Sequence, residues 1–149
     1  MNKGIYPSLF SKTKEHVAFV RGIPLVGEVD YEQICRVYHR AAQLSILEIV
    51  LDAYRDKNKT LFNDLGGKQA LEHLLLTKYN WALDQIRQLS LSDVLLLLHN
   101  ELDLKNIDPA DAAYFERVLE RYDPIVFADV MDEEWDPQIF VQLQQQPRW

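Results

Sequence analysis

Four histidines are the first side chains in this sequence to test for metal binding or acid–base chemistry. They are His16, His39, His73 and His99. None stands in a His-Glu-x-x-His frame, and no Glu-x-x-His pair suggests a di-iron bundle. His99 and Asp103 are four residues apart and could share a helix face, but two ligands without a third make a weak site. We therefore assign no metal ligand.

A nucleophile and a phosphate loop are the next two possibilities. Cys35 is the only cysteine, so it forms no internal disulfide, and we expect it to be a small buried or half-buried residue of a long helix. Gly66-Gly67-Lys68 resembles the end of a phosphate loop, but Phe62 stands where that motif needs glycine and Gln69 where it needs serine or threonine. We assign no catalytic residue and no cofactor.

The carboxyl-terminal segment is the most unusual part of the chain. Five carboxylates fall within eight residues, with aromatic residues among and after them, and without the glycine that a calcium loop requires. Acidic groups orient an approaching partner and aromatic rings anchor it. The predicted partner-binding residues are Asp129, Asp132, Glu133, Glu134, Trp135, Asp136, Phe140 and Trp149. One alternative stays open: Trp135 and Phe140 lock the last helix onto the protein, and the carboxylates form a solvated loop.

Charge is distributed unevenly along the chain, whose net charge is −7. Residues 1–92 contain 12 basic and 10 acidic side chains, whereas residues 93–149 contain 4 basic and 13 acidic ones. The acidic half repels nucleic-acid phosphates, and a helix-turn-helix within residues 63–88 would offer only Arg87 from its second helix. We therefore expect a basic protein partner and no binding to nucleic acid.

Length and composition indicate one folded domain covering residues 1–149. The hydrophobic share of 48% and the charged share of 26% are ordinary for a globular protein. The amino terminus lacks the apolar core of a secretory signal, and the longest aliphatic run, residues 94–98, is too short to span a bilayer. We expect a cytoplasmic protein without a membrane segment.

Apolar residues recur at helical spacing along most of the chain, and alternation typical of strands is scarce. The pattern predicts an irregular all-α bundle of about six to seven helices, with one long central helix at about residues 31–56. The other helices are expected at about 12–21, 68–79, 81–89, 91–102, 109–122 and from 137 onward. Residues 125–131 could form a strand or a helix.

Capping residues set the expected helix ends. Gly22 should end the first helix, and Asp30, Asn80 and Ser90 should each precede one. Asp108-Pro109 and Asp136-Pro137 combine a cap with proline at the first helical position, which is a strong start signal.

In length, acidity and composition the chain resembles small uncharacterised proteins of enterobacterial genomes and their prophages. This resemblance implies a stand-alone accessory protein. We expect a non-enzymatic interaction or regulatory protein that acts through its acidic carboxyl-terminal half. Two alternatives stay open: a toxin-neutralising or DNA-mimicking inhibitor, and an enzyme or ligand-binding bundle whose pocket combines a tyrosine with His39, His73 or His99. Formation of a homodimer also stays open.

Overall fold

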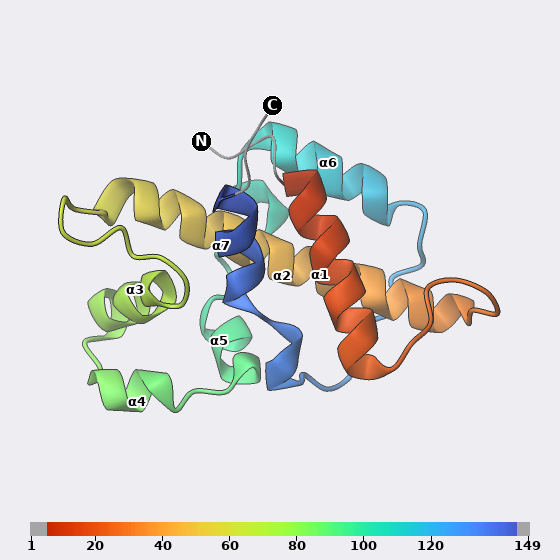
Figure 1. Cartoon of the computed structure of the whole chain (residues 1–149), viewed down its shortest axis with the longest axis horizontal. Coiled ribbons are helices and arrows are strands. Elements are labelled where there is room, and N and C mark those ends of the chain that lie inside the picture. The colour runs from red at the N-terminus through yellow and green to blue at the C-terminus, as the bar shows by residue number, and fades with distance from the viewer. Residues whose placement is uncertain (1–5, 146–149) are drawn as a thin grey trace.

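The computed structural model describes residues 6–145, which form seven α-helices and no strand (Figure 1). The helices are α1 (Tyr6–Arg21), α2 (Tyr31–Asn58), α3 (Gln69–Tyr79), α4 (Leu83–Arg87), α5 (Leu91–Leu97), α6 (Pro109–Leu119) and α7 (Pro137–Gln145). Two short 3₁₀ helices, η2 (Leu104–Asn106) and η3 (Asp132–Glu134), lie in the connections. The predicted all-α fold is confirmed.

Helix α2 is the long central helix that the apolar pattern predicts. Asp30 caps its start by accepting a hydrogen bond from the backbone N–H of Glu32 at 2.9 Å. Figure 1 shows α1, α6 and α7 around one part of α2 and the α3–α5 region around another. Residues 44–49 of α2 are all buried, because neighbours cover this helix on several sides.

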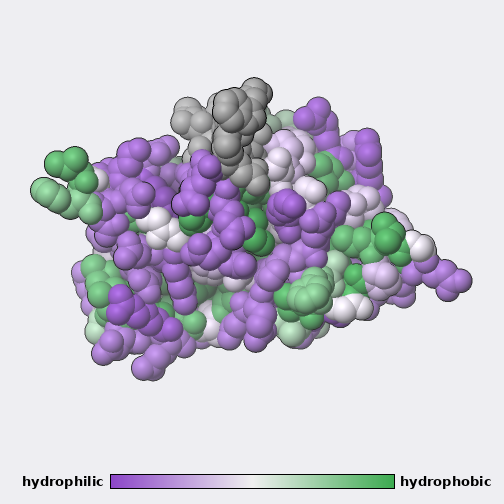
Figure 2. All heavy atoms as spheres, viewed as in Figure 1, coloured by the Kyte–Doolittle hydropathy of each residue, from purple (hydrophilic) through white to green (hydrophobic). Residues whose placement is uncertain are grey.

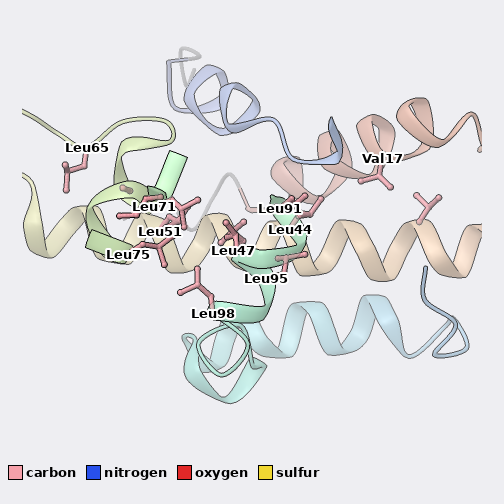
Figure 3. Packing of buried hydrophobic residues seen from close by; sticks show 14 of the residues in the cluster. Val17, Leu44, Leu47, Leu51, Leu65, Leu71, Leu75, Leu91, Leu95 and Leu98 are labelled. Atoms are coloured by element: carbon pink, nitrogen blue, oxygen red, sulfur yellow. The ribbon is translucent and has the colours of Figure 1, made fainter. Parts of the chain in front are cut away.

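Two apolar clusters on α2 form the core. The first joins α2 to α3 and α5 through leucines, and Figure 3 shows several of them pointing toward one another; they include Leu44, Leu47, Leu51, Leu71, Leu75, Leu91 and Leu95. The second cluster joins α2 to α1, α6 and α7, and it contains Leu9, Phe10, Ile46, Phe115 and Phe140. Removing such side chains from water stabilises the fold by roughly 25 cal/mol for each Å² buried.

Most predicted caps are present. Gly22 follows α1 with a φ of 67°, and the N–H of Ile23 donates to the carbonyl of Ala18 at 2.9 Å. Ser90 accepts a hydrogen bond from the N–H of Asp93 at 3.1 Å at the start of α5.

The two aspartate–proline steps also act as predicted. Asp108 caps α6 and Asp136 bonds to the first turn of α7, through the N–H groups of Ala110 and Gln138 respectively. Both bonds are 2.9 Å long.

Four local predictions were wrong. Helix α1 begins at Tyr6, six residues before the expected start near residue 12. Asn80 ends α3 in the left-handed conformation (φ 57°), which asparagine tolerates better than most residues, and Ala82 precedes α4 instead. Helix α5 ends at Leu97 rather than near residue 102, because Asp103 caps η2 and the chain between them forms turns. Residues 125–131 are neither strand nor helix.

Among the described helices, none is both long and apolar enough to cross a membrane.

Candidate interaction surface

The acidic strap, residues 129–136, runs from the irregular segment after α6 to the start of α7. It includes η3, which packs against α1. In Figure 1 this blue segment lies next to the carboxyl-terminal end of α1. A long-range arrangement therefore brings the most acidic part of the sequence beside the first two helices.

Glu134 fixes the strap from inside. Its side chain is 0% exposed, and its Oε1 accepts hydrogen bonds from Arg21 Nη2 and Arg40 Nη1, both at 2.8 Å, and from the N–H of Met131 at 2.7 Å. Both arginines also donate to the backbone carbonyl of Asp129 at 3.0 Å. A carboxylate can be buried in this way because two cations and a backbone donor compensate its lost hydration.

The electrostatics of this cluster follow from burial and pairing. Burial acts to lower the pKa of Arg21, but its hydrogen bonds to Glu134 and Asp129 outweigh that effect and raise the pKa. Burial dominates at Arg40 and lowers its pKa, although Glu134 opposes the change. The hydrogen bond from Arg21 lowers the pKa of Asp129. The ring of Phe127 lies 3.9 Å from the Arg21 guanidinium carbon, which adds a cation–π contact.

Two aromatic residues anchor the strap and the helix after it. Trp135 packs against the first cluster and donates its Nε1–H to Glu48 Oε1 at 2.8 Å. Burial raises the pKa of Glu48 to about 7, against the opposing effects of Arg55 and of the Trp135 hydrogen bond. Phe140 is buried in the second cluster. Both rings therefore make internal contacts, which is what we expect if Trp135 and Phe140 lock the last helix onto the protein.

The predicted partner-binding residues thus divide into internal and external groups. Glu134 and Phe140 are buried, and Trp135 and Asp136 are half-buried. Asp129, Asp132 and Glu133 are exposed. Trp149 lies outside the described residues.

Backbone contacts hold the exposed group in place. The carboxylate of Asp132 accepts a hydrogen bond from the N–H of Leu91 at 2.9 Å, at the start of α5. The carbonyl of Glu133 lies 2.7 Å from His16 Nε2 of α1. These contacts fix the carboxylate of Asp132 and the backbone of Glu133.

Phe19 is an exposed aromatic residue that the sequence reasoning missed. Its side chain is 83% exposed on α1, between His16 and Arg21, which both bond to the strap. Figure 2 shows a hydrophobic patch over the carboxyl-terminal part of α1, next to hydrophilic residues. A helical wheel could have identified it, because Phe19 lies opposite the buried face that includes Val17.

The histidines form no metal site with other groups in residues 6–145. His39 and His99 line one pocket of about 470 Å³ with Asp103, but His99 and Asp103 lie in the turns after α5 rather than on one helix. His73 lies 2.6 Å from the hydroxyl of Tyr54. Cys35 is buried, as the sequence predicts.

The surface formed by the acidic strap and Phe19 is therefore held by a buried ion-pair cluster and remains open to solvent. It combines exposed negative charge with an exposed aromatic ring. Comparison of the chain with protein-family models, with curated proteins and with solved structures finds no match.

Proposed function

We propose that this chain is a non-enzymatic interaction protein that binds a basic protein partner through the acidic strap and Phe19. The observation that carries this proposal is the exposure of Phe19 beside carboxylates that the buried Glu134 cluster holds in place. A large aromatic side chain in water forgoes the stabilisation that burial would give it. Burial against a partner would recover that energy.

Rigidity supports the same function. Arg21 and Arg40 connect the strap to α1 and α2, and further bonds hold the Asp132 carboxylate and the Glu133 backbone, so the strap is fixed on the helix that carries Phe19. A surface that is already ordered loses less conformational entropy when it binds. An exposed aromatic ring on α1 and three exposed carboxylates on the strap bonded to α1 provide the two components of a hot spot with a charged rim.

The charge of the chain supports a basic partner. The acidic half, residues 93–149, has 13 acidic and 4 basic side chains and therefore a net charge of −9 at neutral pH. Such a field accelerates the approach of a cationic surface and repels an anionic one. The effect weakens as salt screens it.

The test is affinity capture from the cell that produces the protein, followed by binding measurements with the captured protein. The variants are Phe19→Ser and the double variant Asp132→Asn with Glu133→Gln. Both should weaken binding, and the charge variant should differ most from wild type at low salt.

Matched controls are present elsewhere on the surface. Phe62→Ser removes another aromatic side chain, which is 92% exposed in the loop before α3, and Asp84→Asn with Glu116→Gln removes two exposed carboxylates, one from α4 and one from α6. Neither control should change binding. The proposal is wrong if the controls weaken binding as much as the test variants do, or if the captured protein binds wild type and test variants equally.

A further inference from the structure

A second surface, between α1 and α6, has the opposite charge. It is a groove of about 530 Å³ whose lining includes three cations and three tyrosines. The cations are Lys14, Arg117 and Arg121, and the tyrosines are Tyr38, Tyr114 and Tyr122. We call it the tyrosine groove. Its volume lies within the range of small-molecule sites, about 300–1,000 Å³.

The cations of the tyrosine groove are unusual in this acidic chain. Residues 93–149 contain only four basic side chains, and two of them, Arg117 and Arg121, line the groove together with Lys14 of α1. No aspartate or glutamate is among the lining residues, and within residues 6–145 none of the three cations forms a salt bridge. A concave surface with one sign of charge concentrates ions of the opposite sign.

The tyrosines give the groove an aromatic wall. The rings of Tyr38 and Tyr122 are 4.1 Å apart between centroids, and Lys14 Nζ lies 5.1 Å from the Tyr38 ring centre. Burial, with a smaller effect of the Tyr38 hydroxyl, raises the pKa of Tyr122 to about 12, and burial also raises the pKa of Tyr114. These two phenols are therefore neutral at pH 7, and they add apolar surface without cancelling the positive charge.

We propose that the tyrosine groove binds a small molecule that combines a phosphate group with an aromatic ring. Guanidinium groups match phosphate oxygens through paired charge-assisted hydrogen bonds. Arg117, in the last turn of α6, and Arg121, two residues after the end of that helix, can supply such bonds. Tyrosine rings contact the aromatic part of such a ligand by stacking or edge-on packing. This site is separate from the acidic strap and does not depend on the function proposed for it.

Phenyl phosphate is the simplest probe that carries both groups, and phenol and inorganic phosphate are its separate parts. Binding to the full chain is followed by backbone amide chemical shifts in a titration. Phenyl phosphate should saturate and shift signals of α1 and α6, and it should bind at least about tenfold more tightly than either part. Arg121→Gln should weaken binding roughly tenfold or more, as expected for losing a hydrogen bond to a charged group.

Lys14→Gln and Lys12→Gln provide a matched pair on the same helix. Both remove one positive charge from α1, but only Lys14 lines the groove, and Lys12 is exposed outside it. Lys14→Gln should weaken phenyl phosphate binding more than Lys12→Gln does. The proposal is overturned if phenyl phosphate does not saturate, if inorganic phosphate binds as tightly, or if the two lysine variants behave alike.

Discussion

Replacing Glu134 by glutamine tests whether the buried ion-pair cluster holds the acidic strap. Glutamine has nearly the same shape and keeps an oxygen that can accept the hydrogen bonds of Arg21, Arg40 and Met131. It lacks the negative charge. Arg40, which is buried, would then have no buried counter-ion at this position, while Arg21 would keep its bond to the exposed Asp129.

The expected cost follows from that loss of compensation. Breaking a buried ion pair by removing one partner destabilises proteins by about 3–5 kcal/mol. Because glutamine preserves an acceptor and Asp129 still faces Arg21, we expect the lower end, about 3 kcal/mol. Domains unfold with a free energy of about 5–15 kcal/mol, so the variant should still fold.

Urea unfolding followed by tryptophan fluorescence measures this difference. The midpoint should fall while the slope with urea stays the same, which indicates lost stability rather than a changed folded state. Glu133→Gln is the control, because Glu133 is the exposed neighbour and its side chain forms no salt bridge within residues 6–145. The control should stay within about 0.5 kcal/mol of wild type. A loss below 1 kcal/mol for Glu134→Gln, or an equal loss for both variants, would refute this reasoning.

Three further predictions concern stability. Burial raises the pKa of Glu48 from 4.5 to about 7, so the unfolded chain loses this proton at a lower pH than the folded protein does. The free energy of unfolding of wild type therefore falls by about 3 kcal/mol as the pH rises from 4.5 to above 7. The free energy of unfolding of Glu48→Gln, relative to wild type, should therefore increase by about that amount between pH 4.5 and 8 in urea titrations; a constant difference would contradict it. Ser90→Ala removes the α5 cap and should cost about 1 kcal/mol in urea unfolding, whereas Ser92→Ala should cost less. Gly67→Ala places a side chain at a φ of 61° and should lower stability by about 1–2 kcal/mol; an unchanged thermal midpoint would exclude backbone strain there.

The helices could be predicted because their signals are local. Asp30, Ser90 and the two aspartate–proline steps act on N–H groups a few residues away, so the sequence neighbourhood contains the necessary information. The end of α5 was misjudged because leucines continue past Leu97, while Asp103 caps η2 and shapes the turns. Apolar spacing alone does not reveal that competition.

The interior of the acidic strap could not be predicted from its sequence. Glu133 and Glu134 are adjacent and chemically identical, yet one is exposed and the other is fully buried. The difference depends on Arg21 and Arg40, which are 113 and 94 residues away from Glu134 along the chain. Only the packing of α1 and α2 against the strap decides which carboxylate turns inward.

That separation along the chain has a consequence for how the protein is made. A ribosome adding about 5–20 residues per second needs roughly 5–20 s to pass from Arg40 to Glu134, 94 residues later. During that interval the emerging α1 and α2 contain two guanidinium groups whose shared carboxylate has not been synthesised. We expect these helices to stay loosely associated until Glu134 has been synthesised, so that chains shorter than this remain open to proteolysis.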